Sequence, residues 1–386
     1  MKRTSCILVI ILLTVMTGCG GNKQLTDELI TVDVTTANYP KKELILQDFM
    51  DVEYIALETN DDFVNQCFVQ DIGKEIILVK NRRNDGDIFV YDRTGKALRK
   101  INRKGQGGEE YVNILGITLD EDYNEMYVHT HYERKIKVYD LYGKFKRSLQ
   151  YKDNTNGYFY TDIVNYDKDN LICFDKFNEE RAFVLISKQD GSITKKIEIP
   201  VKETKLLWQI DAGRNVPADP GPYSTIISFK DNWILLEHSS DTVYTFLPDY
   251  NLHPFIVRTP SIQSMEPEVF LLLRFFSGRY YFMETVKNVF DFNTGRGFPK
   301  TFFMYDWQEK AFFGYNVYNG DYSTKKEIYM NVLRPVNHEI ESWQPLEAHQ
   351  LVESYKKGEL KGKLKEIAAQ LNEDSNPVIM LIKHKK

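Results

Sequence analysis

The chain has 386 residues, a formal net charge of −5 at pH 7, and a composition that is 42% hydrophobic and 13% aromatic. The acidic balance argues against nucleic acid as a partner. Its four cysteines show no C-x-x-C spacing and no dense framework, so neither a zinc centre nor a disulfide-stapled scaffold is indicated.

The amino terminus has the pattern of a secretion signal. Lys2 and Arg3 precede an apolar run from Cys6 to Met16, which is too short to cross a bilayer. The stretch MTGCG that ends this run resembles the bacterial lipobox, in which a cysteine is diacylated and becomes the first residue. We therefore expect 1–18 to be a signal peptide, Cys19 to be the lipidated membrane anchor, and 19–38 to be a flexible tether.

The residues that follow Cys19 bear on where the protein would be displayed. They read GGNKQLTDE, with no acidic residue directly after the cysteine. Surface-export signals of Bacteroidetes lipoproteins usually carry acidic residues at that place. The comparison favours the periplasmic face of the outer membrane over the cell surface.

Cys67 and Cys173 are the two cysteines that would remain without a lipid. They lie far apart in the sequence, and each stands among apolar neighbours. We expect two buried free thiols, with a single disulfide bridge as the alternative in an oxidising periplasm.

A hairpin pattern recurs along the first half of the chain. Ile88–Ile101 lines up with Ile136–Leu149 after a shift of 48 positions, and Val184–Ile197 is a weaker third copy. In each copy, apolar and polar residues alternate on both sides of a glycine turn that is preceded by an aspartate, which predicts a β-hairpin. A period of this length indicates a repeat architecture.

An inner pair of short strands precedes each hairpin, for example Leu115–Leu119 and Glu125–His129. Less regular copies cover Ser224–Val257 and Phe270–Val317, so the sequence contains five fairly complete units. Four-stranded units that stack radially close into a ring. We therefore predict an all-β fold, namely a six-bladed β-propeller of four-stranded antiparallel blades over 39–386.

The sixth blade is predicted to join the two ends of the chain. Asp51–Leu57 and Asn376–Lys383 are strand-like and have no local partner, so we expect them to pair, with Ile328–Leu333 as an inner strand. From about 346 to 372, helix formers with apolar spacings of three and four predict one or two inserted amphipathic helices. Their lysine-rich face is expected to be solvated, with partner docking as the alternative.

The segment from Lys104 to Leu149 resembles an NHL-type repeat: a Gly-rich loop that ends in Glu, a strand, a turn, MYV, a loop, then IKVYDLYGKF. The lipobox, VEYIALET from Val52, RKGQG from Arg103 and NPVIMLIK from Asn376 together resemble the six-bladed β-propeller lipoproteins of Bacteroidetes. The family usually has Pro-Gly where this chain has Gly108 and Glu109. The resemblance implies a fold and hardly an activity, because propellers host many unrelated functions.

In NHL-type blades, the loops between the second and third strands and the loops between blades emerge on one face, the usual ligand face. Transferred to this chain, that face is rich in arginine and aromatic residues, which suit carboxylates, phosphates, sugars or peptide side chains. The candidate ligand-binding residues are Arg82, Arg83, Arg103, Tyr132, Arg134, Arg181, Trp208, Arg214, Tyr223 and Arg296. The alternative is a mixed-charge rim without a ligand. The long loops Leu207–Tyr223 and Val286–Pro299 are the first places to look.

His129 and His131 leave the same face of a strand end, and His238 is the best third ligand for a metal ion. Two histidines do not make a site, and we read these three as surface or rim residues. No cofactor is expected. The Gly-rich loop Gly105–Gly108 has no Walker lysine and opens no helix, so it is a weak phosphate signal.

Three functions remain open at the level of sequence. The first is a lipid-anchored envelope propeller that binds a peptide, glycan or protein on its loop face, without catalysis. The second is a metal-dependent lyase or hydrolase on the same scaffold, because NHL relatives that are lyases use metal-bound histidines. The third is a structural subunit of an envelope complex.

Overall fold

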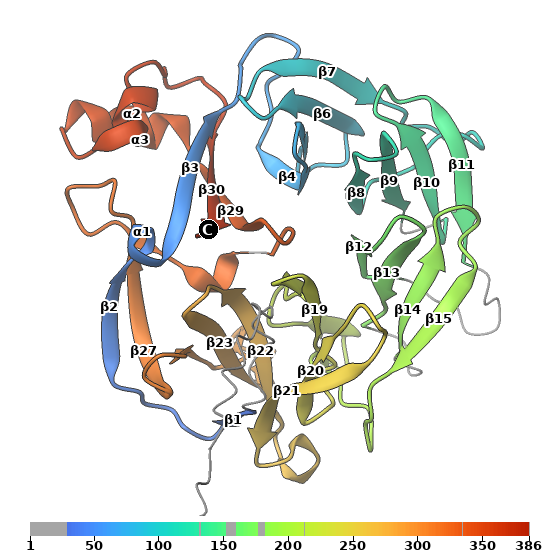
Figure 1. The fold of residues 1–386 in the computed structure, drawn as a ribbon, viewed down its shortest axis with the longest axis vertical. Helices are drawn as coiled ribbons and strands as arrows, with labels where there is room; N and C mark the ends of the chain where they lie inside the picture. The colour runs from blue at the N-terminus through green and yellow to red at the C-terminus, as the bar shows by residue number, and fades with distance from the viewer. Residues whose placement is uncertain are drawn as a thin grey trace, which may run out of the picture.

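A computed structural model describes residues 29–130, 133–151, 160–176, 182–211, 213–333 and 335–385. The described residues form six blades, each a β-sheet, arranged radially around one axis (Figure 1), and two further two-stranded sheets. The predicted six-bladed β-propeller is therefore confirmed. The predicted signal peptide and Cys19 lie outside the described residues.

The first three blades are four-stranded antiparallel sheets whose strands run in sequence order from the axis to the rim. Residues of the second and third strands are buried on both faces, because each blade is packed between two others. These blades contain β4 (Phe68–Ile72), β5 (Ile76–Lys80), β6 (Asp87–Asp92) and β7 (Ala97–Asn102); β8 (Gly116–Asp120), β9 (Glu125–Thr130), β10 (Lys135–Asp140) and β11 (Phe145–Gln150); and β12 (Asp162–Asn165), β13 (Asn170–Phe174), β14 (Ala182–Ser187) and β15 (Ile193–Glu198).

Blades four and five have the same antiparallel core and each gains a parallel strand from the beginning of the chain. Blade four contains β18 (Ile226–Phe229), β19 (Asn232–Leu235), β20 (Thr242–Phe246) and β21 (Leu252–Thr259), and η1 (Ile262–Ser264) follows it. Blade five contains β22 (Val269–Phe276), β23 (Tyr280–Lys287), β26 (Lys300–Asp306) and β27 (Ala311–Tyr318), with β28 (Glu327–Ile328) beside β27. The added strands are β1 (Ile30–Asp33) on β21 and β2 (Lys41–Ile45) on β27.

Strand β1 lies within the range that we expected to be tether. Ile30, Val32 and Val34 are buried, with 3%, 0% and 3% of their surfaces exposed. The alternating pattern ITVD fits an outer strand whose apolar side packs on the blade, so the ordered part of the chain begins before residue 39.

The sixth blade closes the ring with strands from both ends of the chain. It contains β29 (Ile340–Leu346), β30 (Val378–His384) and β3 (Met50–Ala56), and the antiparallel register runs from Met50 opposite His384 to Ala56 opposite Val378. The predicted pairing of the ends is confirmed, and this blade has three strands instead of four.

The expectation that Ile328–Leu333 forms the inner strand of this blade is wrong. Ile328 ends the short strand β28, and η2 (Met330–Val332) follows it as a 3-10 turn. Met330 and Leu333 are buried, but they lie three residues apart and Val332 between them is 60% exposed, which fits a turn and not the alternation of a strand. The innermost strand is β29, which follows this segment.

Two short helices, α2 (Ala348–Lys356) and α3 (Gly362–Ala368), stand between β29 and β30 as the pattern predicted. Leu351 and Leu364 bury their side chains against the sixth blade, and the chain reverses at Gly358, which has a φ of 71°. A one-turn helix, α1 (Leu46–Phe49), precedes β3. Within the described ranges, every helix is too short or too polar to traverse a bilayer.

The Gly-rich loop of the RKGQGGEE motif encloses an ammonium group of the protein itself. Lys137 of β10 is fully buried, and its Nζ donates to the carbonyl oxygens of Gly108 at 3.1 Å and of Glu110. The Glu133 carboxylate lies 3.1 Å from the same nitrogen. The backbone carbonyls of the loop are thus held in place around one lysine of the protein itself.

Cys67 and Cys173 are both buried free thiols, as expected. Burial raises the pKa of each thiol well above its ordinary value. Both groups are therefore packing residues in the reduced state and not reactive thiolates.

The Asn376 side chain fastens the end of the chain to its beginning. Its Oδ1 accepts from the Asn65 amide at 3.0 Å, and its Nδ2 donates to the carbonyls of Glu58 at 2.9 Å and Phe63 at 2.5 Å. Its own amide donates to Thr59 Oγ1 at 2.7 Å.

We predict that Asn376→Ala lowers the free energy of unfolding by about 3 kcal/mol, because it leaves buried backbone groups of the Glu58–Asn65 segment without partners. Urea unfolding followed by tryptophan fluorescence measures this change. Asn84→Ala is the matched control, since Asn84 is exposed and its side chain hydrogen-bonds to none of the described residues. An equal loss of unfolding free energy in the two variants would show that the Asn376 contacts do not stabilise the closed ring.

Candidate functional site: the central well

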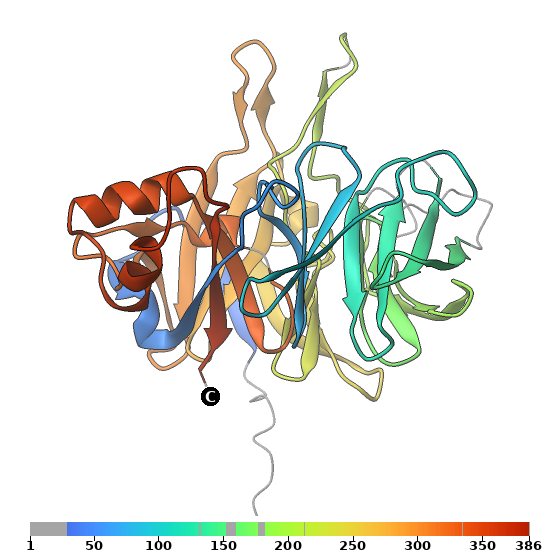
Figure 2. The same cartoon turned by 90° about the horizontal axis from the view of Figure 1, so that it is seen from above.

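The connections between the second and third strands of each blade and the connections between blades leave the same side of the disc, here named the loop face. Two of these connections, one between β15 and β18 and one between β23 and β26, each carry a small hairpin that projects from this face (Figure 2). They are β16 (Gln209–Asp211) with β17 (Val216–Ala218), and β24 (Phe290–Asp291) with β25 (Arg296–Gly297). The C-terminal end lies on the opposite face (Figure 2).

A cavity of about 850 Å³ lies on the axis, lined by residues of all six innermost strands, and we name it the central well. The segment 335–339 crosses the end of the well that lies opposite the loop face. Asn337 Nδ2 in this segment donates to the Ile72 carbonyl of the first blade at 2.9 Å, and His338 Nδ1 lies 2.6 Å from Ser228 Oγ of the fourth. The well is therefore reached from the loop face.

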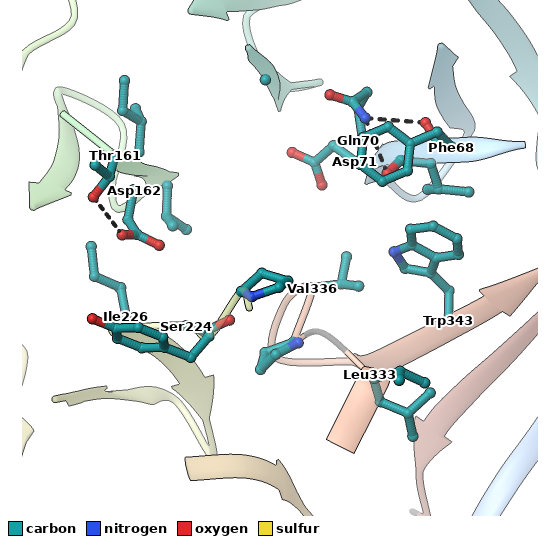
Figure 3. A pocket seen from close by; sticks show the side chains of 18 of the residues that line it. Phe68, Gln70, Asp71, Thr161, Asp162, Ser224, Ile226, Leu333, Val336 and Trp343 are labelled. Carbon is teal, nitrogen blue, oxygen red and sulfur yellow. Dashed lines mark hydrogen bonds between the residues drawn. The ribbon is translucent and has the colours of Figure 1, made fainter. Parts of the chain in front are cut away.

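Aromatic rings line two opposite sides of the well (Figure 3). Phe68 and Trp343 meet edge to face with their centroids 6.4 Å apart, and both are half-buried. Across the well, Lys176 Nζ lies 4.4 Å from the centroid of Tyr223. Ring faces of this kind pack on apolar or C–H surfaces of a ligand.

Most charged groups in the lining are held in ion pairs. Lys176 Nζ lies 3.0 Å from Asp162 Oδ2. Arg274 pairs with the fully buried Glu284, which also has Lys300 Nζ at 3.4 Å. These pairs set the shape of the wall between the third and fifth blades.

One guanidinium group of the lining has no carboxylate partner among the described residues, and two buried polar atoms have no hydrogen bond, one of them on Arg274, which pairs with Glu284 through another nitrogen. The Arg82 guanidinium has no carboxylate within 4.0 Å and lies 5.9 Å from the Phe68 ring. Arg274 Nε and Gln344 Oε1 are buried atoms without a hydrogen bond. Buried polar atoms of native proteins usually have a partner, so these atoms mark where a bound molecule or water would donate or accept.

Asp71 brings a titratable carboxyl group to the well. Burial raises its pKa to about 6, although its oxygens accept from the amides of Leu119 and Ile72, both at 2.8 Å. The carboxyl also ties the first blade to the second, because Leu119 belongs to β8. Asp71 is therefore a structural bridge that is half neutral near pH 6.

Of the predicted ligand residues, the structure brings Arg82 and Tyr223 into the well. Arg83 pairs with Asp85, Arg103 donates to the Gly143 carbonyl of the next blade, and Arg214 pairs with Asp211 in the β16–β17 hairpin. Arg134 is exposed in a turn and Arg296 is exposed in β25, both outside the lining of the well, and Trp208 is half-buried outside that lining. Tyr132 and Arg181 lie outside the described residues.

The candidate metal histidines do not converge. His129 Nε2 lies 3.0 Å from Thr118 Oγ1, whereas His238 lies by Tyr223 and the Lys205 carbonyl; His131 is outside the described residues. Among the residues that the structure describes, no three His, Cys, Asp or Glu side chains are placed to hold one ion.

Sequence reasoning missed most residues of the lining. The innermost strands contribute Phe68, Gln70, Asp71, Asp162, Arg274, Trp343 and Gln344, whereas Lys176 follows β13 and Lys300 begins β26. A signal for them exists. FVQDI, DIVN and LLLRFF place polar residues within short strands that ought to be apolar if the axis were filled by a core. Polar residues at such positions indicate a solvated centre.

The comparisons with known proteins concern the family and the fold. The family model described as "Domain of unknown function (DUF4934)" matches residues 29–383. No curated protein matches the chain. The crystal structure of a candidate exported protein from Bacteroides fragilis is similar at 14% identity with a TM-score of 0.54, over 90% of this chain and 99% of that one.

Two further solved structures align at lower scores. A member of the DUF4221 family from Bacteroides vulgatus has 8% identity and a TM-score of 0.45, over 87% of this chain and 99% of that one. Virginiamycin B lyase from Staphylococcus aureus has 9% identity and a TM-score of 0.38, over 86% and 99%.

We predict that the His129 imidazole stays neutral throughout the physiological pH range, because burial lowers its pKa from 6.5 to about 3. The unfolded chain takes up a proton below about 6.5 and the folded chain does not, so stability falls as the pH falls. His129→Gln should remove a slope of about 1.4 kcal/mol per pH unit below about pH 6.

Urea unfolding between about pH 7 and about pH 5 measures this slope. His253→Gln, on the exposed part of β21, is the control and should keep the slope of the parent chain. A His129→Gln slope equal to that of the parent would show that the imidazole titrates in the folded state.

Proposed function

The chain belongs to the DUF4934 family, and we propose that it is an exported, lipid-anchored propeller that binds a small polar ligand in its central well, without catalysis. The observation that carries the proposal is the well itself, a cavity of about 850 Å³ with aromatic rings and unpaired polar atoms in its lining. Small-molecule sites commonly measure about 300–1,000 Å³ and combine these two kinds of surface.

The energetics of the lining favour an occupant. Arg274 Nε and Gln344 Oε1 are each buried without a hydrogen bond among the described residues, and such a group costs about 1–3 kcal/mol. A ligand that donates to Gln344 and accepts from Arg274 would recover part of that cost. The rigid ring of blades around the well would hold these groups in place before the ligand arrives.

The ionisable groups of the well support binding rather than chemistry. Lys176 is fixed by Asp162, Arg274 by Glu284, and Asp71 by two backbone amides. A general acid or base must be free to exchange a proton with a substrate. Groups that are held by the scaffold in this way are suited to position a ligand.

The path of the first strand supports a particular orientation on the membrane. β1 is parallel to β21, which runs toward the loop face, so Ile30 begins β1 on the opposite face. The ten residues between Cys19 and Ile30 can reach at most about 35 Å. With an acylated Cys19, the well would open away from the outer membrane, into the periplasm in our proposal.

Export itself is supported by the lipobox pattern and by the fold that the chain shares with the candidate exported protein of Bacteroides fragilis. We predict that Cys19→Ala moves the protein from the membrane to the soluble fraction and abolishes labelling with radioactive palmitate. Cys67→Ala, which removes a buried thiol, is the matched control and should change neither result. Membrane retention of Cys19→Ala would contradict the anchor.

Ligand binding is tested with the full chain on arrays of glycans and peptides. We predict a hit that Trp343→Ala weakens at least tenfold, because this ring is a wall of the well. Tyr142→Ala serves as control, since Tyr142 is 76% exposed on an outer turn. A hit that both variants bind equally well would place recognition elsewhere on the molecule, and an array without hits would count against a binding role.

A further inference from the structure

We infer that the ligand of the central well is an acidic saccharide, whose sugar ring packs on Phe68 and Trp343 and whose carboxylate binds Arg82. This inference rests on the proposed function and names the class of ligand. Three features carry it: an arginine without a carboxylate partner among the described residues, an aromatic corner beside it, and backbone groups on the inner edges of β8 and β12 that are already hydrogen-bonded.

The charge of the well is positive although the chain is acidic. Its lining contains the cations Arg82, Lys176, Arg274 and Lys300 and the carboxylates Asp71 and Asp162, and Glu284 lies behind Arg274. The whole chain carries −5. Cations in excess within a concave site attract an anion more strongly than the same cations on an open surface.

Arg82 is the cation of the well that is available. It is exposed at the loop face, and its guanidinium has no carboxylate partner among the described residues, unlike Lys176 or Arg274. Its backbone amide donates to Gln66 Oε1 at 2.9 Å, which fixes the turn that carries it. A planar guanidinium can hold a carboxylate through two parallel hydrogen bonds.

The neighbouring Arg83 provides a built-in comparison. It stands on the same turn with a side chain that is 75% exposed, but its Nε lies 2.9 Å from Asp85 Oδ2 and it does not line the well. The two residues therefore differ in their partners and in their position relative to the well, not in residue type or in loop.

The aromatic corner beside Arg82 suits a sugar ring. Phe68 and Trp343 are half-buried and meet edge to face, so a ligand can cover both at once. Gln344 follows Trp343 in β29 and lies on the opposite face of that strand, toward blade five. Gln70 provides an amide on the same side of the well as the two rings (Figure 3). Amide groups next to ring faces can satisfy the hydroxyls of a sugar whose C–H face lies on the rings.

A peptide is disfavoured because backbone groups on the inner edges of β8 and β12 are already paired with side chains. Asp71 accepts from the Leu119 amide, Asn165 donates to the Leu119 carbonyl at 3.3 Å, and Thr118 donates to the Ile163 carbonyl at 3.0 Å. A peptide that enters such a channel usually gains affinity by adding a strand to a free edge. Side chains of neighbouring blades occupy these positions here.

Titration calorimetry on the full chain in detergent micelles tests the inference with three probes: a galacturonic acid trisaccharide, the uncharged galactose trisaccharide and a triglutamate peptide. We expect the acidic trisaccharide to bind at least tenfold more tightly than either other probe. Arg82→Gln should weaken the acidic trisaccharide about tenfold and leave the uncharged one unchanged, because only the carboxylate contact is lost. Trp343→Ala should weaken both saccharides.

Arg83→Gln is the matched control and should bind all three probes as the parent chain does. Equal affinity for the acidic and uncharged trisaccharides, equal effects of Arg82→Gln and Arg83→Gln, or a preference for the peptide would each overturn the inference while leaving a binding well in place. If none of the probes binds and the glycan and peptide arrays are also silent, the proposed function fails together with it. Thermal melts of the variants, expected to match the parent, exclude misfolding as the cause.

Discussion

The ring is closed by one set of contacts between residues at opposite ends of the chain. β3 and β30 pair over seven residues each, and Asn376 adds hydrogen bonds to the segment that follows β3. Bringing such distant segments together costs chain entropy, which the dense pairing within one blade offsets. Once this blade has formed, each blade of the ring has a neighbouring blade on both of its faces.

Much of the ring could be predicted because its repeat includes turns that depend on residues close together in the sequence. Asp92 and Asp140 accept hydrogen bonds from the backbone amides of their own turns, and Gly95 and Gly143 have φ values of 87° and 84°, so aspartate and glycine at fixed positions mark the outer hairpins of the first two blades. The inner strand of the sixth blade could not be read in the same way. Ile328, Met330 and Leu333 are apolar and buried, but the step from Met330 to Leu333 is three residues, and the segment forms a turn.

The site was less predictable, because it depends on which strand edges meet at the axis. Reasoning from loops led to Arg82 and Tyr223, which do line the well, and also to arginines that bind carboxylates or carbonyls in their own turns. An isolated sequence does not tell whether an arginine has a partner. Trp343 was not predicted for a further reason, because the sequence analysis did not identify the strand that contains it.

The closure of the ring and the floor of the well belong to the same segment. Glu341, fully buried in β29, accepts from the Phe276 amide of blade five at 2.6 Å and lies 3.1 Å from His384 Nε2 at the end of β30. Three residues before Glu341, His338 reaches Ser228 of blade four, and two residues after it Trp343 faces the well. A ligand that packs on Trp343 therefore contacts the strand on which closure depends. Because a ligand that binds only the folded state stabilises it, occupation of the well would also hold the two ends of the chain together.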